Sequence, residues 1–285
     1  MLMRAVEYAR PDSVADAISA LSSHPNARAL AGGQSLINVL KHRLAAPELL
    51  VDISDLSEFR FIDVDDDGSA TIGAAVTYDE LDRSGALRGA HPKLCEVAAT
   101  TVDQQVRCRG TIGGNACYND PASNFPPLLV ALEATMRIES AQGTRSVPAE
   151  EFFFGPFDTA VGQGELLHSI ELPPLGDRGV GYSSILIAED SWALARACAI
   201  LSANGTIEQA RVVLGCVAPA PRRATGVEER LQGAEATPDV VRAAAPAASE
   251  GLDPVSDVHA SGEYRREMAA VVTSRALLEA IPIPT

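Results

Sequence analysis

The chain has 285 residues, 46% hydrophobic and 21% charged, which is ordinary for a folded globular protein and excludes wholesale disorder. Its formal net charge of -15 at pH 7 argues against nucleic-acid binding, which draws on clustered lysine and arginine. No apolar run approaches the roughly 18 residues of a membrane span, and the amino terminus lacks a signal-like apolar core, so we expect a cytoplasmic protein without a membrane span.

The first predicted elements surround a pair of glycines. Apolar residues at helical spacing predict a helix over Pro11–Leu21, with Ser13 as its N-cap. A short apolar strand, Ala27–Ala31, runs into Gly32-Gly33, and a second helix is predicted over Ser35–Leu44. The order helix, strand, glycine turn, helix is typical of a segment that cradles a ligand.

Short strands and helices alternate through the rest of the first domain. Strands are predicted at Leu49–Ile53, Phe59–Val64, Ala70–Ala75, Thr135–Ser140, Arg145–Val147 and Glu165–Leu172, and helices at Tyr78–Leu87, Leu94–Val102 and Pro126–Leu132. The proline pair Pro173-Pro174 then predicts a boundary between a first domain, residues 1–175, and a second, residues 176–285.

The second domain is predicted to mix strands and helices. Strands at Gly181–Ala188 and Gly205–Val217 flank a helix predicted at Trp192–Ser202, with Trp192 as a packing residue. The alanine-rich stretch Val227–Glu250 reads as helical, and Ser261–Ala280 as a final helix.

Two glycine-containing segments are the candidate binding elements. In Ala31–Ser35 the adjacent glycines allow close backbone approach, and amides at the following helix start favour a phosphate. Thr111–Asn115 repeats this chemistry with a hydroxyl, two glycines and an amide side chain. Neither is a P-loop or a G-x-G-x-x-G fingerprint. The pair fits a long diphosphate ligand held from both sides, although two incidental turns remain the alternative.

The five cysteines have no spacing typical of a metal site. They include no C-x-x-C pair, which argues against a disulfide framework, a zinc site or an iron–sulfur cluster in this chain. We therefore expect reduced, mostly buried thiols and no bound metal.

Longer segments around both glycine pairs resemble a known family. The segments AGGQSLINVLKHRLAAPELLVDIS, starting at Ala31, and RGTIGGNACYNDPASNFPPLLVALEATM, starting at Arg109, resemble the two flavin loops of the FAD-binding subunit of molybdenum hydroxylases of the carbon monoxide dehydrogenase, quinoline oxidoreductase and xanthine dehydrogenase type. GELLHSIELP and SDVHASGEYRREMAAVVTSRALLEA are similar to the family's domain junction and closing helix. The resemblance covers nearly the entire chain.

The resemblance implies an α+β fold, with a two-lobed FAD-binding domain of the vanillyl-alcohol-oxidase (PCMH) type followed by a smaller α+β domain. It also implies which residues bind FAD, and none of them needs to act as an acid, a base or a nucleophile. The implied cofactor-binding residues are Ala31, Gly32, Gly33, Gln34, Ser35 and Leu36, then Thr111, Gly114, Asn115, Cys117 and Asp120, and finally Leu166 and Leu167.

The implied function is electron transfer inside a complex. Electrons would pass from a molybdenum cofactor on a large subunit, through [2Fe–2S] clusters on a small iron–sulfur subunit, to the FAD of this chain and on to an external acceptor. The expected assembly is a dimer of heterotrimers. A free-standing FAD-binding accessory protein is the alternative, and a self-contained flavin oxidase is disfavoured because the chain leaves no room for a substrate-binding insert.

Two departures from the family pattern concern the flavin. Asn124 stands where many relatives carry Asp, and Ser184–Glu189 lacks the basic residues that relatives usually carry there. Lost positive charge disfavours an anionic reduced flavin, so a lower flavin potential is expected than in a relative with that base, and a redox titration would test this.

Overall fold

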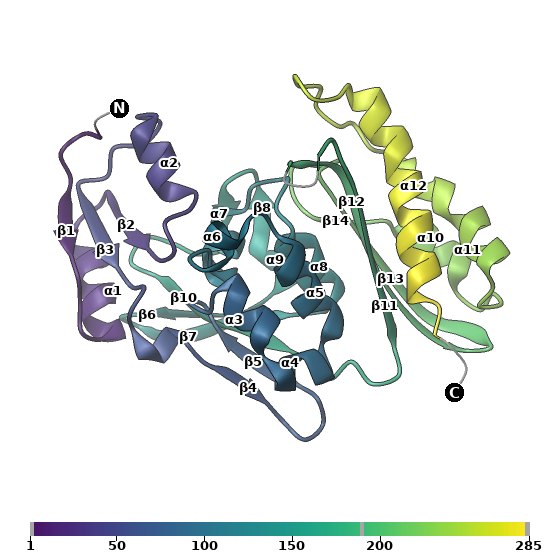
Figure 1. Cartoon of the computed structure of the whole chain (residues 1–285), viewed down its shortest axis with the longest axis horizontal. Helices are drawn as coiled ribbons and strands as arrows, with labels where there is room; N and C mark the ends of the chain where they lie inside the picture. Colours follow the sequence, from purple (N-terminus) through teal and green to yellow (C-terminus); the bar gives the residue numbers. More distant parts are fainter. Residues whose placement is uncertain (1–2, 189–190, 283–285) are drawn as a thin grey trace. The chain divides into compact units, whose positions relative to one another are not determined.

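The computed structural model describes residues 3–188 and 191–282, which belong to two compact units (Figure 1). Unit 1 comprises Met1–Tyr118, Thr135–Phe152 and Asp158–Leu172. Unit 2 comprises Asn119–Ala134, Phe153–Phe157 and Pro173–Thr285. Both units combine helices with sheets, which confirms the predicted α+β class.

Unit 1 opens with a small parallel sheet. Its strands are β1 (Glu7–Ala9), β3 (Leu49–Asp52) and β2 (Ala27–Leu30), in that order. Helix α1 (Val14–Ser23) begins as predicted, because the Ser13 side chain accepts a hydrogen bond from the Asp16 amide. Helix α2 (Leu36–Lys41) is shorter than predicted.

The second sheet of unit 1 is antiparallel and has five strands. Its order is β4 (Ile62–Val64), β5 (Ala70–Gly73), β10 (Leu166–Leu172), β6 (Thr135–Ser140) and β7 (Gly143–Pro148). Four of the predicted strands form two antiparallel hairpins, β4–β5 and β6–β7. A 3-10 turn, η1 (Ser57–Phe59), occupies the start of the predicted strand Phe59–Val64.

Short helices complete unit 1. They are α3 (Tyr78–Arg83), α4 (Gly85–Ala90), α5 (Pro92–Thr100), α6 (Gln104–Arg107), α7 (Ile112–Tyr118) and α9 (Ala149–Phe152), followed by the short strand β9 (Asp158–Thr159). The helix predicted over Tyr78–Leu87 is broken at Ser84, which ends α3 and caps α4 by accepting a hydrogen bond from the Leu87 amide. The second glycine pair lies inside α7 and not in a loop.

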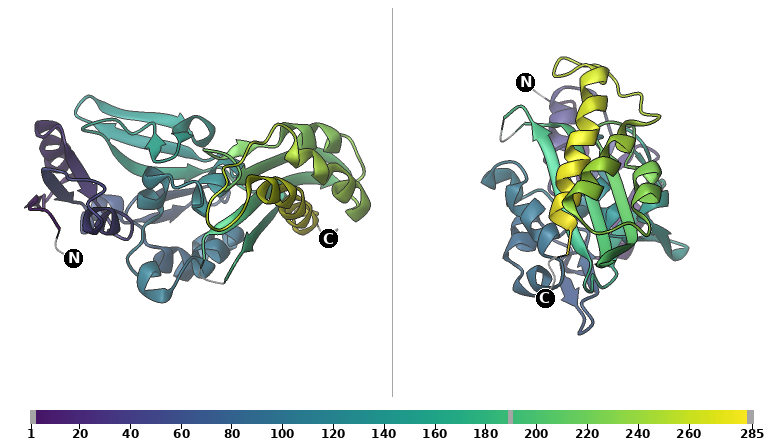
Figure 2. Two further views of the ribbon diagram at one scale, coloured as in Figure 1. Left: turned by 90° about the horizontal axis from the view of Figure 1, so that it is seen from above. Right: turned by 90° about the vertical axis from the view of Figure 1, so that its right-hand side faces the viewer.

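Unit 2 is built on a four-stranded antiparallel sheet. Its order is β11 (Gly179–Leu186), β12 (Ala193–Asn204), β13 (Thr206–Gly215) and β14 (Arg222–Arg223). The other elements are α8 (Phe125–Ala131), β8 (Phe153–Gly155), α10 (Thr225–Leu231), α11 (Pro238–Ala244), η2 (Ala245–Ser249) and α12 (Gly262–Ala280). Helix α12, yellow in Figure 2, lies across β11 and β12.

The predicted helix Trp192–Ser202 is wrong, because Ala193–Asn204 is the central strand β12. Ala195, Ala197 and Ala199 lie in the hydrophobic core formed with α12, and the first nine residues of the strand are all buried. A strand covered on both faces shows no polar alternation, so the alanines suggested a helix where pairing with β11 and β13 decides the structure. Trp192 precedes this strand and is 58% exposed, so it is not a packing residue.

The alanine-rich stretch Val227–Glu250 is broken as well. It contains α10, α11 and η2, separated where Gly233 has a φ of 75 and where Pro238 starts a new helix. The final helix is confirmed as α12. Within the described ranges, no helix is long and apolar enough to cross a membrane.

Candidate functional site

The two glycine-containing segments of unit 1 lie against each other. A Cβ atom added at Gly32 would lie 1.9 Å from the carbonyl oxygen of Arg109 and 3.0 Å from the Cα atom of Gly110. Only glycine allows the backbones to approach this closely. The two segments are far apart in the sequence, and they meet at Gly32.

The first segment presents unused backbone donors. Gly33 has a φ of 73, in the left-handed region that favours glycine, and it turns the chain from β2 toward α2. The Gln34 side chain donates to the Gly32 carbonyl at 3.1 Å, which braces the turn. The amides of Gly33, Gln34 and Ser35 have no acceptor among the described residues. Such amides suit the oxygens of an anionic group.

The second segment uses its amides internally. The Ile112 amide donates to the Val76 carbonyl at 3.0 Å and the Gly113 amide to the Ala74 carbonyl at 3.0 Å. The Gly114 amide donates to Oγ1 of Thr111, also at 3.0 Å. The second segment therefore differs from the first, because its amides are already hydrogen-bonded. It can contact a ligand through its side chains and through the exposed Gly114.

Asn115 supplies an acceptor with no partner. Its side chain hydrogen-bonds the hydroxyl of Tyr78, yet its Oδ1 atom is buried and accepts no hydrogen bond from the described residues. A buried acceptor without a donor is costly unless a ligand or water supplies one. The Asn115 carbonyl, the free amides at Gly33–Ser35 and the close approach at Gly32 together fit the polar groups of FAD.

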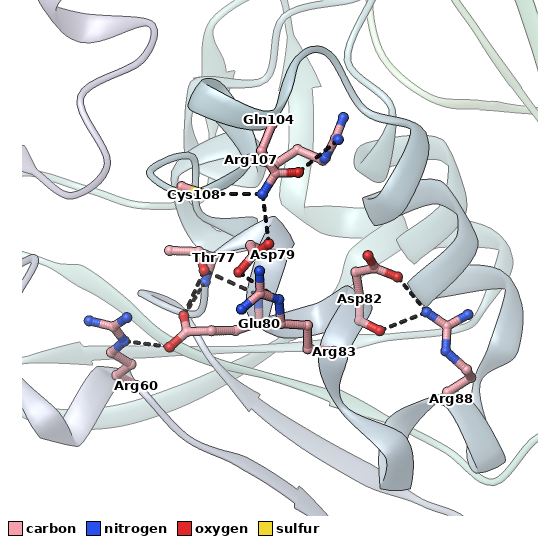
Figure 3. Close-up of polar contacts among 10 residues, drawn as sticks. All are labelled: Arg60, Thr77, Asp79, Glu80, Asp82, Arg83, Arg88, Gln104, Arg107 and Cys108. Atoms are coloured by element: carbon pink, nitrogen blue, oxygen red, sulfur yellow. Dashed lines mark hydrogen bonds and ion pairs between the residues drawn. The ribbon is translucent and has the colours of Figure 1, made fainter.

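A polar network joins the helices that precede Arg109 in the chain, and Figure 3 shows its side chains. Gln104 of α6 donates to Oδ1 of Asp79 in α3 at 2.9 Å and contacts the Cys108 sulfur at 3.2 Å. Thr77 and Glu80 form a capping box at the start of α3. The hydrogen bond between Gln104 and Asp79 joins α3 to α6, the helix that leads into Arg109. The sequence prediction omitted this network, although the T-x-x-E spacing of Thr77 to Glu80 was a usable signal.

Tyr78 gives the site a testable pH dependence. Burial raises the pKa of Tyr78 to about 12, against a smaller lowering by the Asn115 hydrogen bond. The unfolded chain ionises near pH 10, so this contribution to stability is complete below pH 10 and is lost as pH rises toward 12. We expect the free energy of unfolding to fall by at most about 2.7 kcal/mol over that range.

The measurement is urea unfolding between pH 8 and pH 11 of the wild type and of Tyr78→Phe. The variant loses the Asn115 hydrogen bond at every pH, but it should show a flatter pH dependence because it has no phenol to ionise. Equal slopes for both proteins would contradict the assignment.

The remaining predicted residues lie in four places. Leu36 is the partly exposed first residue of α2, and Cys117 lies in α7. Leu166 and Leu167 are buried neighbours in β10, so they point to opposite faces of the sheet. Asp120 belongs to unit 2, where its Oδ1 accepts from the Ala122 amide at 2.9 Å.

The cysteines are expected to differ in reactivity. Burial raises the pKa of Cys117 to about 12, which leaves roughly one thiol in 10⁴ ionised at pH 8. By surface area Cys95 and Cys198 are buried, Cys117 and Cys216 are half-buried, and Cys108 is exposed. We therefore expect native protein to show one fast-reacting thiol with a disulfide reagent at pH 8, absent in Cys108→Ser. A fast thiol that persists in that variant would contradict this ranking.

Comparison with known proteins identifies the family. Residues 4–175 match the family model described as the FAD binding domain in molybdopterin dehydrogenase, and residues 182–280 match the CO dehydrogenase flavoprotein C-terminal domain. The glyceraldehyde dehydrogenase medium chain of Sulfolobus acidocaldarius is 37% identical over 273 residues, with 95% of this chain and 97% of that protein covered. The carbon monoxide dehydrogenase medium chain of Hydrogenophaga pseudoflava is 35% identical, with 95% of each chain covered.

A solved structure agrees with these sequence matches. Quinoline 2-oxidoreductase from Pseudomonas putida 86 aligns with a TM-score of 0.94 at 34% identity, covering 99% of this chain and 98% of that one. The family resemblance read from the glycine segments is thus confirmed over the length of the chain. The chain belongs to the molybdenum hydroxylase flavoproteins, a family of oxidoreductases, as an FAD-binding medium subunit.

Proposed function

We propose that this chain is the electron-transfer subunit of a heterotrimeric molybdenum hydroxylase. When bound, FAD supplies the redox chemistry, accepting electrons from [2Fe–2S] clusters of a small iron–sulfur subunit and giving them to an external acceptor. A large subunit with the molybdenum cofactor carries the substrate site, and the expected assembly is a dimer of heterotrimers in the cytoplasm. Residues 1–175 form the FAD-binding domain in this proposal, and residues 176–285 the second domain.

The observation that carries the proposal is the contact between Gly32 and the Arg109 carbonyl. It joins the segment with free amides to the segment with the unpartnered Asn115 oxygen. The chain binds and orients the cofactor, and no acid, base or nucleophile is assigned. The residues proposed to hold FAD are Ala31, Gly32, Gly33, Gln34, Ser35, Leu36, Thr111, Gly114, Asn115, Cys117, Asp120, Leu166 and Leu167.

The substrate is a property of the large subunit in this proposal. The relatives carry names with chemically different substrates, namely glyceraldehyde, carbon monoxide and quinoline. Similarity of the flavin subunit therefore identifies the cofactor and not the substrate. The expectation of a lowered flavin potential also stays a prediction, and Glu189 of the segment on which it rests lies outside the described residues.

The testing experiment is purification of the tagged full-length chain from its native host. We expect the visible spectrum of a flavin, one FAD per chain on denaturation, and co-purification of an iron–sulfur subunit and a molybdenum subunit. FAD without partner subunits would instead favour the free-standing accessory protein. A colourless protein that takes up no FAD on reconstitution, alone or with its partners, would overturn both readings.

A further inference from the structure

Arg196 of β12 is a buried cation in unit 2. The residue is 2% exposed, and its Nη1 atom donates to the carbonyl oxygens of Ala122 at 2.8 Å and Ser123 at 2.5 Å. No carboxylate of the described residues pairs with it. Burying a guanidinium is costly unless its environment compensates the charge. An ion pair therefore does not account for the burial of Arg196, and the role of this side chain must lie in its hydrogen bonds to the two carbonyls.

The turn that Arg196 holds is clamped at three consecutive carbonyls. Besides the two that Arg196 takes, the Pro121 carbonyl accepts from the Cys216 amide at 3.0 Å. Cys216 reaches this position with a φ of 68, a left-handed conformation that is unfavourable for a residue other than glycine. Strand β12 and the end of β13 therefore hold residues 121–123 from one side.

The clamped turn carries Asp120. Its Oδ1 atom accepts from the Ala122 amide at 2.9 Å, and its carbonyl accepts from the Ser123 amide at 2.8 Å. Its other carboxylate oxygen has no partner among the described residues. The amides of the turn donate to Asp120, and the carbonyls of the turn accept from Arg196 and Cys216. The orientation of the Asp120 carboxylate therefore depends on this turn.

The guanidinium also lies near an aromatic ring. Its Cζ atom lies 5.6 Å from the centroid of the Tyr182 ring, within the range of a cation–π contact. A single atom, Nη1, donates to both carbonyls, and the planar guanidinium fixes the directions of its two N–H bonds, whereas the donors of an ammonium group rotate freely at the end of a flexible stem. Lysine at this position would keep the positive charge but would hold the Ala122 and Ser123 carbonyls less firmly.

We propose that Arg196 is a positioning residue for the cofactor, which acts by fixing the turn at residues 120–123 and with it the carboxylate of Asp120. The inference rests on the proposed function, because Asp120 is among the residues proposed to contact FAD. Among the described residues, the hydrogen bonds and the ring contact of the Arg196 guanidinium are with the turn, Cys216 and Tyr182. Its effect on FAD therefore has to pass through Asp120.

The test is a double-mutant cycle in the full-length protein purified with its partner subunits. The variants are Arg196→Met, Asp120→Asn and the double variant, and Asp120→Asn keeps the oxygen that accepts from the Ala122 amide. FAD affinity is measured by quenching of flavin fluorescence on the deflavinated protein. Arg196→Lys is added in case Arg196→Met does not fold. The matched control is Arg211→Met, which removes another arginine of unit 2 that donates to a backbone carbonyl, that of Val130 at 2.9 Å.

Each single substitution should weaken FAD binding by about tenfold, and the double variant should be no more than about twofold weaker than the worse single one. Arg196→Lys should fall between wild type and Arg196→Met, and Arg211→Met should bind FAD normally. Hydrogen exchange at the Ala122 and Ser123 amides should accelerate in both Arg196 variants and not in Arg211→Met, whether or not FAD is present.

The inference would be overturned if the loss of FAD affinity in the double variant equalled the product of the two single losses. Normal FAD affinity in both Arg196 variants would also overturn it. If Asp120→Asn bound FAD like the wild type while the exchange result held, Arg196 would still position the turn, but the assignment of Asp120 to the cofactor would fail. A wild-type protein that bound no FAD would refute the proposed function itself, and this result is distinguishable from the other two.

Discussion

Gly32→Ala is expected to weaken FAD binding and to destabilise unit 1. The new methyl group would lie 1.9 Å from the Arg109 carbonyl oxygen and 2.7 Å from its carbon, so two backbone segments have to separate. Both atoms that the methyl group would meet belong to the backbone, so no flexible side chain can move aside. The segment at Arg109 also cannot shift easily, because α6 before it is held to α3 by the hydrogen bond from Gln104 to Asp79. We expect the free energy of unfolding of the FAD-free protein to fall by about 3 kcal/mol or more, and FAD affinity to fall at least about tenfold.

FAD content after gel filtration and urea unfolding measure the two effects. The matched control is Gly89→Ala, because Gly89 lies inside α4 of the same unit and an added Cβ would meet nothing within 4 Å. The Gly89→Ala protein should bind FAD normally, and its free energy of unfolding should rise by up to about 1 kcal/mol because alanine has the higher helix propensity. A Gly32→Ala protein with one FAD per chain and unchanged stability would show that the two segments do not need their close approach.

Gly181→Ala is expected to destabilise unit 2 without any contact with a cofactor. The added Cβ would lie 1.8 Å from the carbonyl oxygen of Ala276, because α12 packs directly on β11 at this glycine. Gly179, two residues earlier, meets the Ala280 carbonyl in the same way at 2.1 Å. Ala276 and Ala280 are both buried completely, so α12 has no room to move without opening the core. We expect a loss of about 3 kcal/mol or more in the free energy of unfolding.

The measurement is urea unfolding with Gly226→Ala as the control. Gly226 lies in α10 of the same unit, and its added Cβ would first meet a carboxylate oxygen of Glu250 at 3.3 Å, which is the mobile end of a side chain. The control should stay within about 1 kcal/mol of the wild type. Comparable losses in Gly181→Ala and Gly226→Ala would contradict the claim that α12 requires glycine beneath it.

Elements with a strong local signal were predicted correctly from the sequence. Helix α1 has its N-cap at Ser13 and a continuous apolar face, and the hairpins β4–β5 and β6–β7 have turn residues between short strands. Each of these depends on residues close in sequence, so propensity and capping suffice to predict it. The resemblance of the segments starting at Ala31 and Arg109 likewise identified the family, which the comparisons confirm.

Elements defined by distant partners were predicted poorly. Strand β12 was read as a helix because its alanines have high helix propensity and its two buried faces erase the polar alternation of a strand. The grouping of Asn119–Ala134 with unit 2 was likewise not foreseen, since those residues lie within the range predicted for the first domain. In both cases contacts far away in the sequence outweigh local preference.

At the candidate site, the glycines, the hydroxyl of Thr111 and the family of the chain can be read from the amino-acid sequence. The fold adds that Gly32 abuts the Arg109 carbonyl and that the Ile112, Gly113 and Gly114 amides are already hydrogen-bonded. It also adds that Oδ1 of Asn115 has no donor among the described residues. This division arises because a motif specifies only which groups a segment carries. Whether those groups remain available to a ligand depends on which of them the rest of the fold has already bound.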